Sequence, residues 1–467
     1  MEETNESERI GSLDVFRKNK MIILLTISLS CLVLSGYVTT NKNKESYGEQ
    51  HRFEQDRFVI SFWFDPPADE HMDTRYKEMA DAHFNLVLGG FGAKTEADVS
   101  RQLDLCDKYG MKAIVSLPGY VKGATEGVKA AAEVKQHENF PDHKACWGYM
   151  LRDEPSTEDF PNLSYMVDYL RENRPGKLAY MNLFPNYASP KQLGTESYKE
   201  HVVRFVNEVK PEVLCMDHYP FMEPNVTALN LDHTTDWVLD KENPRIDKIS
   251  RTGYCENLAV LREIAQEKGI PFWNFFNVMP FGRHSDPTEA QIRWQVYTSI
   301  AYGAKGILYF CYQSPTGAHG EVFEKGGAIL TVDGKKTRHY EEAKRVNFAI
   351  KNLGNTLMKL ESTAVHRVTR KDDPNHVLKG TAIKSLSKGD YLIGEFHHSD
   401  GRRAVLLNNY SYAYTAWPTV VFDADPDDVI EVDQVTGIER GFIDDSPDMN
   451  GLQVSINSGA GRLFILP

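Results

Sequence analysis

Cysteine is scarce in this sequence, and the few cysteines follow no recognisable pattern. Six occur in 467 residues, and none has CxxC or zinc-site spacing. A disulfide scaffold or a structural zinc site would show such spacing, so neither is indicated. Cys146, Cys215 and Cys311 each lie in an apolar, strand-like run. We interpret these three as small core residues.

Motifs for nucleotides, metals and serine chemistry are also missing. No GxGxxG, P-loop or nucleophile-elbow pattern occurs in the required setting, and "GGFG" (89–92) follows a strand but lacks the dinucleotide-binding spacing. His218, His319 and Glu321 are potential metal ligands, but no HExxH or other paired spacing accompanies them. We therefore predict no metal and no cofactor.

Positive charge is in deficit. The formal net charge is −13, and the only basic cluster is "RKNK" near the N-terminus. A nucleic-acid partner is therefore not expected. Hydrophobic residues make up 41% and charged residues 25% of the chain, which is ordinary for a globular protein. The length predicts one large domain and a smaller one.

The basic cluster precedes a run of apolar and small residues, "MIILLTISLSCLVLSG". Its position and positive flank predict that the chain is exported, to the periplasm, the cell surface or a membrane-anchored state. We assign residues 1–40 to a signal or anchor segment and 41–56 to a linker. A cleaved signal, an uncleaved anchor and a lipoprotein modified at Cys31 all remain open.

From about residue 57, apolar β-rich runs alternate with amphipathic helical segments. Near-continuous apolar runs are typical of parallel strands covered on both faces. Eight repeats of strand and helix predict an α/β fold, a (β/α)8 TIM barrel over residues 57–359. The eight runs are 58–65, 84–91, 112–119, 146–153, 177–184, 212–219, 271–278 and 304–312.

After a closing helix, the pattern changes to short alternating strands separated by turn residues. This change predicts a C-terminal antiparallel β-sandwich over residues 360–467. The connection from 222 to 252 is the longest insertion in the barrel, and it lies on the face that carries active sites in such barrels.

Polar residues end the predicted strands. TIM barrels build their active sites from the loops at the carboxyl ends of the strands. Asp153 and Glu154 end the fourth run, in "CWGYMLRDEP", and Asp217 ends the sixth. We predict these three as catalytic residues. Further strand-end or strand residues are predicted to bind substrate: Asp65, Trp63, Tyr149, Asn182, Tyr219, Trp273, Asn277 and Tyr312.

These residue types suit glycosidic bond cleavage. One carboxylic acid protonates the leaving oxygen, and a second group attacks or activates water. Glu154 is the candidate acid/base, because an acid held near apolar strand ends has a raised pKa. Aromatic planes bury the apolar faces of sugar rings. The predicted partner is therefore a carbohydrate substrate.

The segment "WGYMLRDEP" resembles the fourth-strand acid/base segment of barrel glycoside hydrolases related to clan A. "RWQVYTSIAYGAKGILYFCY" and "GGAILTVDGKKTRHYEEAKRVN" resemble the last strand and closing helix of family 42-type β-galactosidases. The resemblance covers most of residues 57–467. It implies a glycoside hydrolase with Glu154 as proton donor.

The seventh strand departs from this pattern. Clan A enzymes carry their nucleophilic glutamate there, whereas "PFWNFFNVMPFG" contains no acid. Three alternatives follow. Asp217 serves as nucleophile or base; or Asp153 and Glu154 act as a pair, similar to that of substrate-assisted N-acetylhexosaminidases; or the barrel binds glycans without cleaving them.

Overall fold

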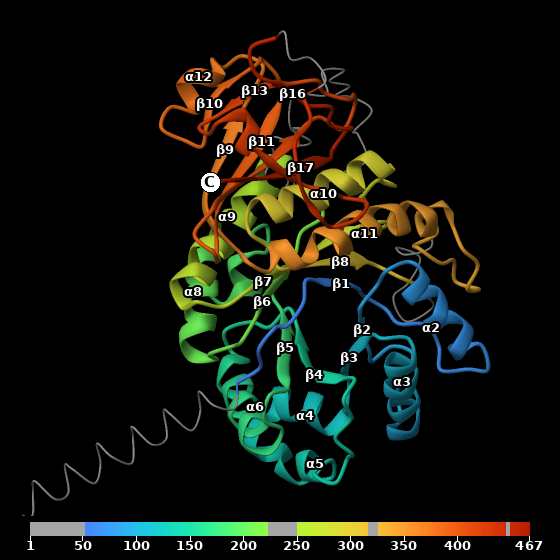
Figure 1. Cartoon of the computed structure of the whole chain (residues 1–467). Coiled ribbons are helices and arrows are strands. Elements are labelled where there is room, and N and C mark those ends of the chain that lie inside the picture. Colours follow the sequence, from blue (N-terminus) through green and yellow to red (C-terminus); the bar gives the residue numbers. More distant parts are fainter. Residues whose placement is uncertain (1–51, 223–249, 316–325, 445–448) are drawn as a thin grey trace, which may run out of the picture. The chain divides into compact units, whose positions relative to one another are not determined.

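The computed structural model describes residues 52–222, 250–315, 326–444 and 449–467. Strands and helices alternate through the first part of this chain (Figure 1). The strands are β1 (Val59–Phe62), β2 (Leu86–Leu88), β3 (Lys112–Val115), β4 (Cys146–Asp153), β5 (Leu178–Asn182), β6 (Leu214–Asp217), β7 (Phe272–Asn277) and β8 (Gly306–Phe310). The helices are α2 (Met72–Asp81), α3 (Glu96–Lys108), α4 (Pro118–Glu126), α5 (Ala131–Lys135), α6 (Phe160–Asn173), α7 (Pro190–Leu193), α8 (Tyr198–Glu208), α9 (Arg251–Lys268), α10 (Glu289–Ala301) and α11 (Arg338–Leu357).

The eight strands form two parallel sheets, β1-β8-β7-β6 and β2-β3-β4-β5, that are joined at both edges. Between β5 and β6, the Leu183 amide donates to the Cys215 carbonyl at 2.8 Å. Between β1 and β2, the Asn85 amide donates to the Ile60 carbonyl at 3.0 Å, and the Asn85 side chain accepts from the Ile60 amide at 2.9 Å. The sheet therefore closes into a barrel, which confirms the predicted fold class.

A packed core fills the barrel. Alternate residues of a strand point to opposite faces, so each strand sends one set of side chains inward and one set toward the helices. The inward set is buried and forms a single cluster with a member from every strand: Val59, Leu86, Ile114, Met150, Tyr180, Cys215, Phe275 and Leu308.

Local sequence signals account for the helix ends. In α3, the Thr95 hydroxyl accepts from the Asp98 amide at 3.2 Å, and the Asp98 carboxylate accepts from the Thr95 amide at 3.1 Å. This reciprocal cap satisfies two amides that the first helical turn leaves without partners. Just after the helix, Gly110 has φ +72°, a left-handed conformation that glycine adopts at low cost. The chain then enters β3.

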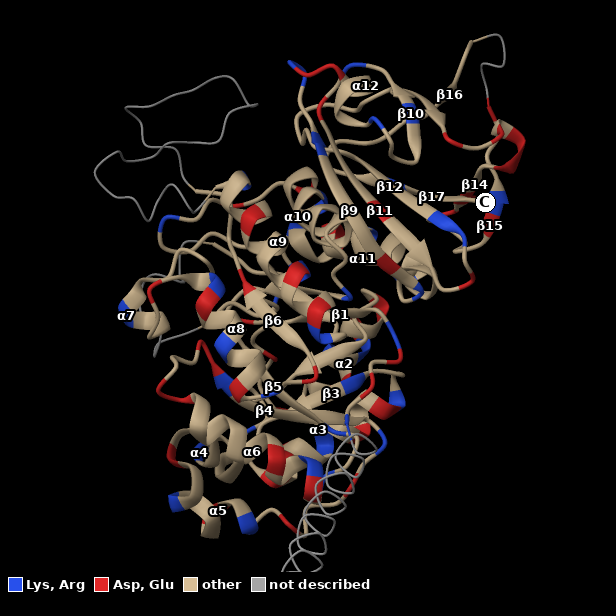
Figure 2. Ribbon diagram, turned by 90° about the vertical axis from the view of Figure 1, so that its left-hand side faces the viewer, with Lys and Arg blue, Asp and Glu red and all other residues tan. Residues whose placement is uncertain are grey.

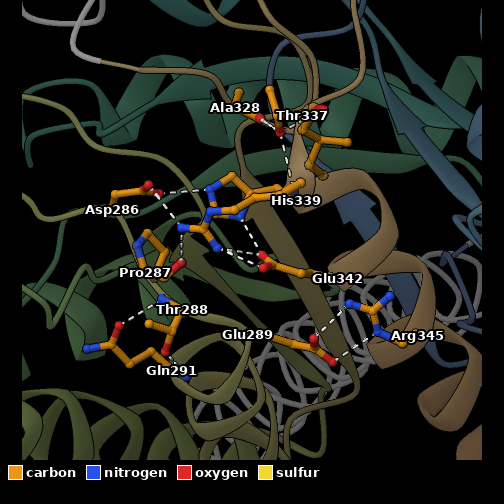
Figure 3. Close-up of polar contacts among 12 residues, drawn as sticks. Asp286, Pro287, Thr288, Glu289, Gln291, Ala328, Thr337, His339, Glu342 and Arg345 are labelled. Atoms are coloured by element: carbon orange, nitrogen blue, oxygen red, sulfur yellow. Dashed lines mark hydrogen bonds and ion pairs between the residues drawn. The ribbon is translucent and has the colours of Figure 1, made fainter.

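The loop between β7 and α10 is tied to α11 by a group of charged residues (Figure 3). His339 is buried between two carboxylates, with Nε2 2.8 Å from Asp286 and Nδ1 2.8 Å from Glu342. Arg338 pairs with both acids, at 2.9 and 2.7 Å. Burial lowers the pKa of His339, but the hydrogen bonds to Asp286 and Glu342 outweigh it and leave that pKa above its usual value. This network holds the chain that follows β7.

The C-terminal part forms two antiparallel sheets, of order β15-β14-β17-β12-β11-β9 and β10-β13-β16 (Figure 1). This confirms the antiparallel β architecture predicted for the end of the chain. The elements are β9 (Leu360–Val368), α12 (Pro374–Val377), β10 (Ile383–Leu386), β11 (Tyr391–His398), β12 (Arg403–Asn409), β13 (Thr419–Phe422), β14 (Ile430–Val432), β15 (Glu439–Gly441), β16 (Leu452–Gln453) and β17 (Gly461–Leu466).

These sheets contact helices α9 and α10 of the barrel. Asn408 of β12 donates to the Tyr297 carbonyl in α10 at 2.8 Å. Arg262 of α9 donates to the Ser362 hydroxyl at 2.8 Å. Because α9 and α10 flank β7, the C-terminal part buttresses the side of the barrel that carries Asn277.

Several sequence predictions lie outside the described residues: the 1–40 segment with Cys31, most of the linker, nearly all of the 222–252 connection, and the potential ligands His319 and Glu321. Within the part of the chain that the structure describes, no helix is long and apolar enough to cross a membrane. Figure 2 shows acidic and basic residues interspersed over the helices around the barrel.

Candidate active site

The end of β4 turns sharply, and this turn places two acids together. The pairing of β4 with β5 shifts register between Met150 and Arg152, and Asp153 is then paired with Asn182. Glu154 has φ +45°, which is uncommon for a residue with a side chain, and its amide donates to the Asn182 carbonyl at 2.8 Å. The strand has ended before Pro155. Adjacent residues therefore need not point to opposite faces.

Asn182 joins two of the three predicted catalytic acids. Its Nδ2 donates to Asp153 at 3.1 Å and to Asp217 at 2.9 Å. Flipping the amide would point its oxygen at both carboxyl groups, so the two acids fix its orientation. The ends of β4, β5 and β6 thus meet in one hydrogen-bonded group, as their neighbouring positions in the barrel require.

All three acids have raised pKa values. Burial, followed by the charge of Asp153, raises the pKa of Glu154 to about 7. Burial and the charges of Glu154 and Asp153 hold the pKa of Asp217 well above its usual range, although Asn182 and Tyr219 donate hydrogen bonds to it. Burial also raises the pKa of Asp153, and the Asn182 hydrogen bond opposes this. Glu154, with a pKa of about 7, is therefore protonated in part of the molecules at neutral pH.

Asp153 is both reachable by solvent and crowded by protein. By accessible area it is an exposed residue, whereas Asn182 and Asp217 are buried at 4% and 7% exposure. Desolvation nevertheless dominates the shift in its pKa. A carboxyl on the wall of a concave site has both properties, because many protein atoms surround it while one side stays open. A ligand can reach Asp153 from this open side.

Aromatic side chains occupy the opposite part of the barrel mouth, at the ends of β1, β2, β7 and β8. Trp63 packs against Phe91 with ring centroids 5.1 Å apart, and Phe281 packs against Phe310 at 4.9 Å. All four are partly exposed. Tyr219, which follows β6, contacts Phe281 at 5.1 Å and Phe310 at 5.2 Å. The mouth thus has an acidic side and an aromatic side.

Asp65 has a structural role. It is 1% exposed, and its carboxylate accepts from the amides of Phe91, Gly92 and Ala93 at 2.9, 3.0 and 3.3 Å. The Gln102 amide donates to it at 3.1 Å. Burial raises the pKa of Asp65 to about 6 despite these donors. The structure does not support the predicted sugar contact, because backbone amides of the loop after β2 already donate to the carboxylate oxygens of Asp65.

Asn277 ends β7 where clan A enzymes have their nucleophile. It is fully buried, and its Nδ2 donates to the Ser285 carbonyl at 3.3 Å. Its backbone amide and carbonyl are both bonded by the Gln295 side chain. The Oδ1 atom has no donor within the described ranges. These contacts tie Asn277 to the strand end, and burial keeps it from a ligand.

Three aromatic residues predicted to bind substrate lie in the core instead. Tyr149 packs against Tyr120 at 4.9 Å, Tyr312 against Phe62 at 4.6 Å, and Trp273 lies inside the barrel. Each is at most 1% exposed. Burial on both faces of the strands hides these rings from any ligand, so the structure gives them a packing role.

Other residues at the site were not predicted. Tyr187, in the loop after β5, packs on His218 with ring centroids 5.0 Å apart. Burial, followed by the charges of Asp217 and Glu154, holds the pKa of Tyr187 well above its usual range. Burial lowers the pKa of His218 to about 3, so its ring is neutral. Tyr187 lies outside every predicted strand, and only its position after a strand end could have indicated it.

No metal site is evident in the part of the chain described. Across residues 52–222, 250–315, 326–444 and 449–467, no three His, Cys, Asp or Glu side chains are grouped to hold an ion. His218, a potential ligand by sequence, instead lies 3.1 Å from the Asn257 side chain.

Comparison with known proteins shows the fold alone. No protein-family model and no curated protein sequence matches the chain. A catalytic mutant of a family 42 β-galactosidase from G. stearothermophilus is structurally similar, with a TM-score of 0.54, 10% identity and coverage of 88% of this chain and 98% of that one. A family 39 glycoside hydrolase from Bacteroides cellulosilyticus WH2 gives a TM-score of 0.49 at 12% identity, covering 90% of this chain and 82% of that one.

A β-galactosidase from the psychrophilic Marinomonas ef1 gives a TM-score of 0.44 at 12% identity and is matched over 63% of this chain. The present chain spans 60% of the length of that enzyme. The chain is thus structurally similar to TIM-barrel glycoside hydrolases at low sequence identity.

Proposed function

We propose that this protein hydrolyses a glycosidic bond in an oligo- or polysaccharide, with Glu154 as the proton donor. The observation that carries the proposal is the Glu154 carboxyl itself, which stands at the mouth of the barrel with a pKa of about 7. A group with this pKa is protonated in a substantial fraction of molecules at neutral pH and is a strong enough acid to assist the leaving oxygen.

The barrel mouth has an acidic side and an aromatic side, and this arrangement supports a sugar as substrate. A pyranose ring has one apolar face that stacks on aromatic planes and hydroxyl groups that bind carboxylates. The aromatic side at β1, β2, β7 and β8 and the acidic side at β4 to β6 suit these two needs. Asp153 and Asp217 are the described acids beside Glu154, and one of them takes the second role.

The experiment is hydrolysis of a panel of aryl glycosides by the purified full chain, alongside Glu154→Gln. Glutamine keeps the shape of the side chain but cannot donate a proton to the leaving group. We expect Glu154→Gln to lose about 10²- to 10⁴-fold in rate, the usual contribution of a general acid. Hydrolysis that is equally fast in both proteins would refute the assignment.

A second candidate is a glycan-binding protein without catalysis. Asn277 favours it, because the β7 strand end carries an amide where clan A enzymes require a carboxylate. Calorimetric binding of oligosaccharides with no turnover by the wild-type chain would select this candidate.

A further inference from the structure

The outer face of one C-terminal sheet carries an exposed tryptophan. Trp417 is 73% exposed, more than any other tryptophan in the ranges that the structure describes. It precedes β13, and its neighbours Ala416 and Pro418 are both buried. An indole that stays largely in water adds little to the packing of the sheet, so packing does not explain this residue.

Backbone hydrogen bonds determine which side chains surround Trp417. The ladder bonds beside it are each 2.9 Å long and join Ala416 N to Ile456 O, Ile456 N to Ala416 O, and Val454 N to Pro418 O. The pairing of β13 with β16 continues this register, with Thr419 opposite Gln453. Trp417 is therefore directly opposite Ser455, in a non-hydrogen-bonded pair whose side chains lie close together on one face.

Alternation along these two segments separates a buried face from a polar one, because successive side chains of a strand point to opposite faces. The inward set is apolar and buried: Ala416, Pro418, Val420, Leu452, Val454 and Ile456. The outward set is exposed or half-buried, and it surrounds the indole with uncharged hydroxyl and carboxamide groups: Thr415, Thr419, Gln453, Ser455 and Asn457. We call Trp417 with this outward set the Trp417 face.

Hydrogen bonds hold the Trp417 face in shape. The Gln453 side chain donates to the Thr419 hydroxyl at 2.8 Å. Arg462 donates to the Ser455 carbonyl at 3.4 Å, and its guanidinium is ion-paired with Glu431. These groups are therefore ordered before a ligand arrives, which reduces the entropy cost of binding.

A cavity of about 260 Å³ borders the Trp417 face. Ser455 and Asn457 belong to both, and the acids Glu431 and Asp433 also line the cavity. A carboxylate that already accepts one hydrogen bond has lone pairs for further donors. The cavity thus adds acceptors for hydroxyl groups beside the indole.

These features fit a sugar better than other classes of ligand. A pyranose ring stacks one apolar face on an aromatic plane, and its hydroxyl groups bind hydroxyl, carboxamide and carboxylate groups at the rim. The centre of a protein interface is a contiguous apolar patch, whereas the indole of Trp417 lies among polar side chains. Nucleic acid requires basic residues, and the outward set contains none.

We propose that the Trp417 face is a carbohydrate-binding site, separate from the barrel mouth, that binds internal rings of an uncharged polysaccharide. A sheet face has no wall that would close off the ends of the chain. Arg293, near the start of α10, donates to the Ser458 carbonyl at 3.0 Å, and α10 begins on the side of the barrel that carries the mouth. The site requires no turnover and so goes beyond the proposed hydrolysis.

Binding to insoluble polysaccharides tests the proposal. The purified full chain would be mixed with microcrystalline cellulose, insoluble xylan, mannan or curdlan, and the protein left in solution would be measured to give a Kd for each. We expect wild type to bind at least one of them. Trp417→Ala should weaken that binding at least about tenfold, because it removes the aromatic plane.

Further variants separate this face from the rest of the molecule. Trp417→Tyr keeps an aromatic plane and should bind within about threefold of wild type, and Asn457→Ala should bind about three- to tenfold more weakly. Phe348→Ala is the matched control, since it removes an aromatic residue that is 38% exposed on α11, and it should bind like wild type. Trp63→Ala reports on binding at the barrel mouth. Because Trp417 and Asn457 are exposed, their variants should melt at the wild-type temperature.

The outcomes distinguish the proposals. Polymer binding that Trp417→Ala leaves unchanged, or that only Trp63→Ala removes, overturns the inference, as does the absence of binding to every polymer. Self-association that is lost in Trp417→Ala, without polymer binding, assigns the face to a second copy and also overturns it. Binding through Trp417 without hydrolysis of any glycoside supports this inference and refutes the proposed function. Hydrolysis that depends on Glu154, without such binding, does the reverse.

Discussion

Removing the Asn182 amide should raise the pKa of Asp153, and the effect can be worked out from two hydrogen bonds. In Asn182→Ala, Asp153 and Asp217 lose the donors at 3.1 and 2.9 Å. Both bonds lower the pKa of their acceptors, because they stabilise the ionised form. Asp217 keeps its hydrogen bond from Tyr219. Asp153 therefore shows the clearer change.

A hydrogen bond to a charged group contributes about 1.5–3 kcal/mol. Because Asp153 is exposed, we take the lower end, about 1.5 kcal/mol, which corresponds to about one pKa unit. The donor favours the ionised acid, so its contribution to stability is present above the pKa of Asp153 and is lost as the pH falls through it.

The assay is urea denaturation of wild type and Asn182→Ala at pH 7.5 and at pH 3.5. The variant should lose about 1.5 kcal/mol more of its unfolding free energy at pH 7.5 than at pH 3.5, whether or not the protein is an enzyme. Asn173→Ala, which removes an exposed bond on α6, is the control and should show no such difference.

If the protein is active, the acidic limb of the kcat/KM profile should also move up by about one unit in Asn182→Ala. An unfolding penalty that is the same at both pH values, together with an unmoved acidic limb, would refute the role given to Asn182.

Further predictions concern the neighbouring groups. The rate of glycoside hydrolysis should fall above pH 7 as Glu154 deprotonates, because the pKa of Glu154 is about 7. This alkaline limb of the pH–rate profile should be lost in Glu154→Gln. Asp65→Ala leaves three partly or fully buried amides without their acceptor and should cost about 3 kcal/mol, measured by chemical denaturation. Asn277→Asp should destabilise the chain increasingly as the pH rises, since a buried carboxylate would face the Ser285 carbonyl; equal stability at pH 5 and pH 8 would contradict this. Because the pKa of His339 is raised in the folded protein, its bonds to Asp286 and Glu342 stabilise the fold fully below about pH 6.5, and this stabilisation is lost as the pH rises through the folded-state pKa. His339→Phe should remove this part of the pH dependence of the melting temperature.

The sequence predicts the barrel well because each strand lies in a mostly apolar run that the fold buries. The rule that loops at the carboxyl strand ends build the site brought Asp153, Asn182 and Asp217 into one region, and in the structure they are hydrogen-bonded together. Those strand ends are adjacent in the sheet. Their proximity therefore follows from strand order alone.

The orientation of the aromatic residues could not be predicted in the same way. Strand β4 is buried along nearly its whole length, so hydrophobicity does not distinguish its two faces. Its pairing also shifts register twice, once with β3 and once with β5, which breaks the alternation that would have placed Tyr149. The partners of Asp65 come from a loop more than 25 residues away, a separation that no local pattern reports.

The central claim is that Glu154 donates the proton in glycosidic bond cleavage, and leaving-group dependence tests it most directly. Rates of wild type, Glu154→Gln and the control Asp168→Asn, which changes an exposed acid on α6, would be compared on aryl glycosides whose leaving phenols span a range of pKa. We predict that Glu154→Gln loses about 10²- to 10⁴-fold on poor leaving groups, which need protonation, and much less on good ones, while the control matches wild type. A loss that is uniform across leaving groups, or no loss at all, would contradict the assignment of Glu154 as the acid.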